Sequence, residues 1–547
     1  MNYGFIIDNR KCIGCHACTV ACKSEHDVSV GVNRTWVKYV EKGAFPDTRR
    51  LFSVMRCNHC EDAPCVEICP TTALYTRDDG IVDFDPRRCI GCKGCMQACP
   101  YDALYIDPET ETAAKCNYCA HRVDIGLEPA CVNVCPEHAI ISGDMANPDT
   151  EISGLLAREQ VTVRKADKGT KPKLFYIEGD ESTLNPTSTE PSSDYMWSSQ
   201  STGVGHFAKY AEDRISHADP IQMARLLAAQ GSIDDAHSEN EIIVPPGEGM
   251  SDHAEAVKQE NAQRVYDAPG KGILWGWEVT AYVWTKGIAA GAFLVPFLAM
   301  VFNWAQVSQE TLWLGAETGL LFLLFTTILL VMDLDQPRRF LYVLLRPQWR
   351  SWLTLGGYAL TIYGALLTLW CVAMVLNRSA LAGGIQGLAA LFAVITAVYT
   401  AFLFAQAKGR DFWQSPTLSL HMIVHSVMAG AAIFAIFGFF TGGSRSWYGF
   451  LTDLIYISII VNILVLLFEL ITTHSTAAAK QVVSMILTGR YSVSFCFGVV
   501  LIGNVLPLWC VWLGGTTSLA VAGICILIGI YITEHIWVRA PQTLPLS

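Results

Sequence analysis

The chain has 547 residues, with 39 basic and 50 acidic side chains and a formal net charge of −11. A chain of this length is too long for one domain, and its acidic excess falls in residues 1–270, which hold 26 basic and 41 acidic side chains. Nucleic-acid binding requires a basic face, so this balance argues against nucleic acid as a partner. Beyond residue 270 long apolar stretches dominate, and the sequence is therefore interpreted as two joined units.

Sixteen of the twenty cysteines lie within the first 140 residues, in four groups of four. Disulfide scaffolds are short secreted chains, whereas this chain opens without an apolar signal segment, so disulfides are not expected. The first and third groups have the spacing C-x2-C-x2-C-x3-C, which is typical of bacterial ferredoxins. The second and fourth are variants, and three of the groups end in Cys-Pro. The groups begin at Cys12, Cys57, Cys89 and Cys116.

This spacing indicates iron–sulfur clusters. Three closely spaced thiolates bind one cluster and the fourth reaches a neighbouring cluster, so each group is expected to serve two clusters. Structural zinc is the alternative, because C-x2-C pairs also suit tetrahedral zinc. A zinc site needs neither the third cysteine nor the Cys-Pro ending. Short strands at 81–84 and 103–106 flank the cysteine turns, which predicts a duplicated α+β fold of bacterial-ferredoxin type that its clusters stabilise.

Residues 1–180 resemble, through these groups, the four-cluster ferredoxin subunits of the DMSO reductase and polysulfide reductase family of molybdenum enzymes. The resemblance implies four [4Fe-4S] clusters, with the first and fourth groups sharing two and the second and third sharing the others. The implied ligand sets are Cys12, Cys15, Cys18 and Cys135 (set 1); Cys22, Cys116, Cys119 and Cys131 (set 2); Cys57, Cys60, Cys65 and Cys99 (set 3); and Cys69, Cys89, Cys92 and Cys95 (set 4).

Residues 181–272 form the expected linker, rich in Ser, Thr, Pro, Asp and Glu. Two short helices are predicted, at 219–230 and 251–265. A solvated tether is the simplest interpretation. The segment is long for a mere connection, so we expect part of it to lie on the ferredoxin domain or on a partner subunit.

Residues 273–540 are predicted to be an all-α bundle of eight transmembrane helices, because apolar stretches long enough to cross a bilayer recur there. The spans are 277–303, 312–332, 353–376, 383–405, 417–440, 449–471, 491–512 and 518–538. Small residues such as those in Gly287–Gly291 favour close helix packing. An even number of spans puts both ends of the bundle on the same face of the membrane.

The short connections on the ferredoxin side hold nine basic residues, whereas those on the other side hold two, Arg378 and Arg445. The positive-inside rule therefore predicts an inner-membrane protein with a cytoplasmic ferredoxin domain. The nine are Arg338, Arg339, Arg346, Arg350, Lys408, Arg410, Lys480, Arg490 and Arg539. Arginines beside Pro337 and Pro347 could instead serve a redox site, which would weaken this assignment.

The second half is similar to the eight-helix NrfD-like membrane subunits of polysulfide reductase. The matching stretches are Tyr282–Phe293, Asp333–Phe340 and Ala407–Trp413. This resemblance implies electron exchange with a quinone, menaquinone or ubiquinone, and no haem. Ionisable residues inside a bilayer are costly and suggest function, and most of those here, Glu469 and Glu534 among them, fall toward the ferredoxin side.

Glu278, Tyr282 and Lys286 are spaced four apart on one helix face, which favours them for the quinone pocket. His421 and His425 share a face of the fifth span and are candidates for quinone or proton chemistry. They cannot both ligate one haem iron, and a partner such as His474 would be needed for each, so haem is not expected. Asp333, Asp335 and Glu534 lie near helix ends, where salt bridges with Arg338, Arg339 or Arg539 are an equal alternative.

The sequence therefore predicts an electron-transfer and membrane-anchor subunit that carries a quinone-reactive site, while a separate large molybdopterin subunit performs the primary reaction. A cytoplasmic ferredoxin domain favours a sulfite dehydrogenase in that family. A reductase of DMSO, polysulfide or tetrathionate, a hydrogenase partner and a component of an ion-translocating respiratory complex are the alternatives.

Overall fold

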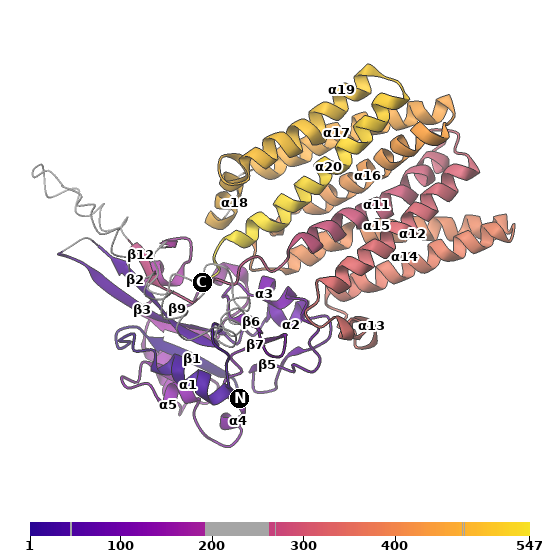
Figure 1. Cartoon of the computed structure of the whole chain (residues 1–547). Coiled ribbons are helices and arrows are strands. Elements are labelled where there is room, and N and C mark those ends of the chain that lie inside the picture. The colour runs from indigo at the N-terminus through magenta and orange to yellow at the C-terminus, as the bar shows by residue number, and fades with distance from the viewer. Residues whose placement is uncertain (44–45, 192–261, 269, 473, 475) are drawn as a thin grey trace, which may run out of the picture.

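The computed structural model describes residues 1–43, 46–191, 262–268, 270–472, 474 and 476–547. It has an N-terminal half of sheets and short helices and a C-terminal bundle of long helices, and the bundle extends away from the N-terminal half (Figure 1). This confirms the predicted α+β ferredoxin-like half and helical membrane half. The predicted helix at 219–230 lies outside the described residues.

Two four-stranded sheets frame the N-terminal half. The first has the order β8-β1-β10-β9, and its core pair β1–β10 is parallel. The second has the order β11-β12-β2-β3. The strands are β1 (Tyr3–Asp8), β2 (Thr35–Lys42), β3 (Arg49–Arg56), β8 (Ile140–Asp144), β9 (Val161–Thr162), β10 (Leu174–Ile177), β11 (Glu190–Pro191) and β12 (Ala262–Tyr266).

Two short hairpins lie between these sheets in sequence, and they carry the central cysteine groups. They are β4 (Leu74–Thr76) with β5 (Val82–Phe84), and β6 (Leu104–Asp107) with β7 (Thr112–Lys115). These match the predicted strands at 81–84 and 103–106. The short helices are α1 (Ala17–His26), α2 (Pro64–Ile68), α3 (Gly94–Ala98), α4 (Ala120–Val123), α5 (Ala130–Asn133), α6 (Glu151–Arg158) and α7 (Glu181–Leu184), with the 3-10 turn η1 (Ala166–Lys168).

Both ends of the predicted linker belong to the N-terminal half. Residues 181–184 form α7, and β12 pairs antiparallel with β2. The prediction of a helix over 251–265 is therefore wrong at its C-terminal end, where 262–265 belong to a strand. The pairing with β2 supplies the backbone hydrogen bonds that a helix would have made internally, so tertiary pairing overrides the local helical preference.

Among the described residues, eight helical spans are long and apolar enough to cross a membrane, as predicted. They are α11 (Trp277–Val301), α12 (Gln309–Met332), α14 (Trp352–Val375), α15 (Ser379–Gln406), α16 (Leu418–Thr441), α17 (Arg445–Ile471), the π-helical stretch η6 (Ser494–Val505) continued by α19 (Leu506–Leu513), and α20 (Thr516–Arg539). Connecting turns are η4 (Pro337–Arg339), α13 (Tyr342–Leu345), η5 (Asp411–Gln414), α18 (Ala477–Leu487) and η7 (Ala540–Thr543).

Helix α11 lies at the centre of the bundle, in contact with α12, α15, α16 and α20. The close approach of α11 and α16 depends on glycine. A Cβ on Gly291 would collide with the backbone of Ser426 and Gly430, and one on Gly430 would collide with Gly291. The small-residue run at 287–291 therefore allows the backbones to touch, as predicted.

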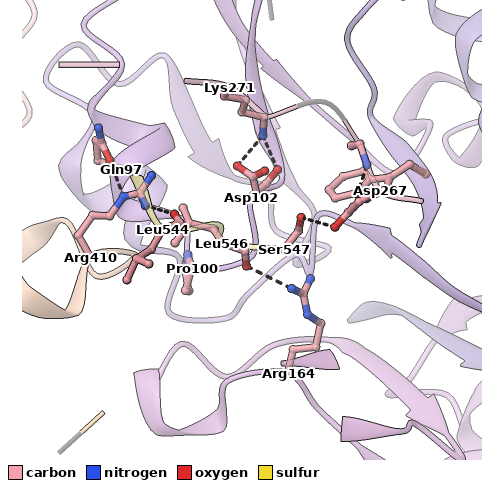
Figure 2. A network of polar contacts seen from close by, with 12 residues as sticks. Gln97, Pro100, Asp102, Arg164, Asp267, Lys271, Arg410, Leu544, Leu546 and Ser547 are labelled. Carbon is pink, nitrogen blue, oxygen red and sulfur yellow. Dashed lines mark hydrogen bonds and ion pairs between the residues drawn. The ribbon is translucent and has the colours of Figure 1, made fainter. Parts of the chain in front are cut away.

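The C-terminal segment returns to the N-terminal half and ties the two halves together (Figure 2). Buried Arg410 donates to Gln97 Oε1 at 2.9 Å and to the Leu544 carbonyl at 2.8 Å. Arg164 donates to the Leu546 carbonyl at 3.3 Å, and Lys271 pairs with Asp102 at 2.8 Å. These contacts lock the ferredoxin half onto one end of the bundle.

Candidate functional site: a line of cysteine sets ending at a membrane cavity

The sixteen N-terminal cysteines gather in four sets, each mixing two of the sequence groups. Two sets surround cavities: one cavity is lined by Cys12, Cys15, Cys18 and Cys135, and another by Cys69, Cys89, Cys92 and Cys95. Twelve of the sixteen thiols are buried. Four thiols around a buried cavity form the donor set that a [4Fe-4S] cluster requires.

Thiols of the other two sets affect each other's pKa, which indicates that they lie close together. Burial raises the pKa of Cys65, and the neighbouring Cys99, Cys57 and Cys60 raise it further. In set 2, burial raises the pKa of Cys22, and Cys116, Cys131 and Cys119 add to the shift. The structure thus brings together thiols from different sequence groups, and the four complete ligand sets stay a prediction from the resemblance.

The sets follow one another in a line. Neighbouring sets meet through pairs of thiols close enough to affect each other's pKa, which are Cys18 with Cys131, Cys57 with Cys116, and Cys95 with Cys65. Set 1 ends at the surface, where Cys15 is exposed. Set 4 ends at the membrane half, because Trp275 at the start of the bundle donates its indole N–H to the Cys92 carbonyl at 3.1 Å.

A buried arginine beside set 2 was missed by the sequence analysis. Arg56 Nη2 lies 3.0 Å from Cys131 Sγ, and its guanidinium stacks over Phe5 with 4.3 Å to the ring centroid. The residue is fully buried, and its Nε and Nη1 have no hydrogen-bond partner in the described part of the chain. In the sequence, the one indication of a role for Arg56 near a cluster is its position directly before Cys57. A permanent positive charge there favours the more negative, reduced state of a cluster.

We therefore expect Arg56→Met to lower the reduction potential of the cluster in set 2. At about 5 Å and an effective dielectric constant of about 20, the lost attraction is about 3 kcal/mol, which corresponds to on the order of 100 mV for one electron. A redox titration followed by electron paramagnetic resonance (EPR) measures it. Exposed Arg87, changed to Met, is the matched control, and an equal shift in both variants would contradict this role of Arg56.

The loop after α12 wraps the Cys89–Lys93 turn. Lys93 pairs with Asp335 at 3.1 Å and donates to the Asp333 carbonyl at 2.9 Å. Asp333 and Asp335 therefore pair with Lys93 of the ferredoxin half, and not with Arg338 or Arg339 as one alternative had it. Burial raises the pKa of Asp333 to about 7, against the opposing effect of Lys93.

Arg339, in the same loop, donates to the Pro86 and Cys89 carbonyls at 2.8 and 3.0 Å. Gly91, with φ of 70°, lies so close to Asp335 that a Cβ would be 2.6 Å from the aspartate Cβ. Arg339 holds the set 4 turn by hydrogen bonds, and Gly91 allows the turn to approach the loop after α12 closely.

A cavity of about 210 Å³ opens between α11, α12, α13, α14 and α15, directly beneath set 4. Its wall is largely apolar, and its polar groups include Tyr282, Tyr399, Asp333 and Thr327. Ile90 and Cys92 of the ferredoxin half line it together with Trp275. An apolar cavity with a few convergent polar groups is typical of a cofactor site.

The structure separates the residues that the sequence analysis grouped as quinone candidates. Tyr282 lines the cavity, whereas Glu278 and Lys286 are absent from its described lining. Lys286 lies one turn deeper, where its Nζ donates to Thr400 Oγ1 at 2.7 Å and to the Ala397 carbonyl at 3.0 Å. The apolar wall from α13 and α14, including Val343, Leu344 and Gly357, gave no sequence signal, because such residues are common in every membrane helix.

His421 and His425 also lie outside the lining of this cavity. Each is paired with a carboxylate from another helix, His421 with Glu469 at 2.9 Å and His425 with Glu534 at 2.7 Å. Glu534 thus pairs with His425 and not with Arg539. The sequence analysis named all four residues but could not pair them, because the partners are 48 and 109 positions apart.

Comparison with known proteins agrees with this geometry. Residues 11–74 and 48–145 match families described as "4Fe-4S dicluster domain", and residues 268–543 match "Polysulphide reductase, NrfD". A stretch of 180 aligned residues is 45% identical to a polysulfide reductase subunit of Wolinella succinogenes, over 32% of this chain and 93% of that protein.

A tetrathionate reductase subunit of Salmonella typhimurium is 43% identical over 34% of this chain and 75% of its own length. Protein NrfC of Escherichia coli is 42% identical over 32% and 81% respectively. The cysteine sets, the eight spans and these matches together show an iron–sulfur unit fused to a multi-pass membrane domain. This protein belongs to the NrfD polysulphide reductase family, with a 4Fe-4S dicluster unit joined in front of its membrane domain.

Proposed function

We propose that this chain carries electrons through four [4Fe-4S] clusters between a separate catalytic subunit and a membrane quinone, menaquinone or ubiquinone. The observation that carries the proposal is the shared cavity: Cys92 of the last cysteine set and Tyr282 of the bundle line the same apolar space. A quinone ring held there would lie beside the cluster that supplies or accepts its electrons.

The cavity also suits the proton part of quinone chemistry, which needs two protons for every two electrons. The Tyr282 hydroxyl can donate to a quinone carbonyl from within the membrane. Asp333 lines the cavity beside Lys93 of the ferredoxin half, where a carboxyl with a pKa of about 7 can both hold and release a proton near neutral pH. The apolar wall excludes water from the ring and accommodates an isoprenoid tail.

The opposite end of the cysteine line is the proposed contact for the catalytic subunit. Cys15 is exposed, and Ile13 beside it is 55% exposed. The relatives are named as subunits of polysulfide, tetrathionate and thiosulfate reductases. We therefore propose a large molybdopterin subunit as the partner and a reductase-type complex as the setting.

The proposed orientation has the ferredoxin half in the cytoplasm. Sulfite oxidation remains a prediction that depends on this orientation. Two of the nine basic residues on that side, Arg339 and Arg410, donate hydrogen bonds to the ferredoxin half. They are therefore weaker evidence for the orientation under the positive-inside rule than the other seven.

Reduction of the clusters by a quinol tests the function without the catalytic subunit. The full chain, purified in lipid nanodiscs, is mixed anaerobically with menaquinol or ubiquinol, and cluster reduction is followed by EPR. We expect the quinol to reduce at least one cluster, and a competing quinone analogue to prevent it. If dithionite reduces the clusters but neither quinol does, the proposal is wrong.

A further inference from the structure

Four ionisable side chains meet inside the bundle, near its ferredoxin-side end and apart from the proposed quinone cavity. His421 and His425 come from the first turns of α16, Glu469 from the last turn of α17, and Glu534 from near the end of α20. Each is no more than 4% exposed. The cluster is therefore isolated from water, and its members must satisfy one another or a bound ligand.

The two carboxylates hold the two imidazole rings in fixed orientations. His421 Nδ1 lies 2.9 Å from Glu469 Oε2, and His425 Nδ1 lies 2.7 Å from Glu534 Oε1. Glu469 is itself fixed, because it accepts hydrogen bonds from Thr417 Oγ1 and from the Trp537 indole, both at 3.0 Å. A carboxylate bonded to one ring nitrogen, as Glu469 is to His421, is the usual support of a histidine whose other nitrogen binds a metal, whereas the Glu534–His425 pair brings two possible metal donors together.

The second nitrogen of each ring makes no hydrogen bond within the described part of the chain. Nε2 of His421 and Nε2 of His425 are buried and make no hydrogen bond with any described residue. Buried polar atoms are normally paired, so the unpaired Nε2 of His421, which lies 3.9 Å from Glu534 Oε1, requires an explanation. The rings are close together, with centroids 4.1 Å apart.

We propose that His421, His425 and Glu534 bind a divalent transition-metal ion of the Zn²⁺ class. One donor atom from each of the three residues lies within 4.8 Å of the other two. Two separations are 3.9 Å, from His421 Nε2 to Glu534 Oε1, and 2.7 Å, from His425 Nδ1 to Glu534 Oε1. A tetrahedral ion with bonds of about 2.1 Å needs about 3.4 Å between donors. The ion would therefore lie between His421 Nε2, His425 Nδ1 and Glu534 Oε1 and would replace the hydrogen bond between the last two atoms, which must move apart.

The ligand set and its charge both suit this ion. Two histidines and one carboxylate form a zinc site that leaves a fourth position for water or another ligand. Two carboxylates in an apolar bundle also need positive charge nearby. Lys286 lines the same small cavity as His425 and Glu534 and supplies one charge. One more positive charge is needed, which a divalent ion with a hydroxide in its fourth position would supply. Protons on the imidazoles are the competing source, and the experiment separates the two.

Metal binding by the full-length chain, purified with its clusters, tests the site. After dialysis against a chelator, Zn²⁺ is added back and counted by mass spectrometry together with iron. We expect one zinc per chain. His421→Asn and Glu534→Gln should weaken zinc binding at least about tenfold, and Glu469→Gln, which removes only the support, about 10- to 100-fold. His535→Gln, on the same helix as Glu534 but outside the set, should bind zinc normally.

Co²⁺ replacement distinguishes this site from the cysteines. Cobalt bound by nitrogen and oxygen gives visible d–d bands without the thiolate charge-transfer bands of a cysteine site. Iron content and thermal unfolding in metal-free buffer establish that each variant is folded. If the unaltered chain retains no metal, protons on the imidazoles balance the carboxylate charges, which overturns the proposal. So does zinc binding that is equal in all variants, or cobalt bands of thiolate type.

Discussion

Replacing Cys69 by serine is expected to alter the cluster of set 4 while leaving the cluster of set 3 intact. In the sequence Cys69 belongs to the group that begins at Cys57, so a simple one-group, one-cluster arrangement predicts the reverse. In the structure its side chain lines the cavity formed by Cys89, Cys92 and Cys95. Potentiometric EPR resolves the clusters and shows which signal is lost or converted to a three-iron form.

Cys69→Ser should reduce electron transfer strongly, because set 4 is the set that adjoins the membrane half. Loss of even an outer-shell partner costs a metal site about 10- to 100-fold, so loss of a ligand should reduce quinone-linked turnover by at least about tenfold. Cys99→Ser is the reciprocal variant, since burial and the charges of set 3 act on Cys99. It should change set 3 and spare set 4. If Cys69→Ser instead altered the cluster of set 3 and Cys99→Ser that of set 4, each cysteine group would bind its own cluster and the groups would not be interleaved.

The fold was largely predictable because its signals are local. Cysteine spacing identifies ferredoxin turns without knowledge of tertiary contacts, and long apolar runs identify membrane helices. The second predicted linker helix is partly wrong for the opposite reason. Residues 262–266 form β12 because they pair with β2, which lies more than 200 positions earlier in the chain. A local sequence pattern carries no information about such a distant pairing partner.

The candidate site was predictable where the residue type itself carries chemistry. All sixteen cysteines, Tyr282 and the two histidines stand out in the sequence. Their partners do not, because a membrane helix buries apolar residues on every side and gives no sign of which face lines a cavity. The carboxylates opposite His421 and His425 could be named but not paired, since pairing depends on the rotation and depth of three separate helices.

The proposed quinone cavity should close when Gly357 is replaced by leucine. Gly357 on α14 lines the cavity, and an added Cβ would lie 3.2 Å from Val343 Cγ1 and 3.9 Å from Leu344 Cδ2. The rest of a leucine side chain would then occupy the part of the cavity that we propose for the quinone ring. Overpacking of this kind costs about 1–3 kcal/mol, which corresponds to about 5- to 150-fold weaker quinone binding.

Steady-state turnover with quinol and an artificial acceptor measures this loss, which should appear mainly as a raised KM for the quinol. Reduction of the clusters by dithionite, which does not use the cavity, should be unchanged. Gly387→Leu is the matched control, because Gly387 is also a helical glycine of the bundle but is exposed, with nothing within 4 Å of an added Cβ. Equal losses in both variants would indicate a general effect on the bundle. A normal KM in Gly357→Leu would place the quinone elsewhere, because a ring bound beneath Cys92 cannot share that space with a leucine side chain.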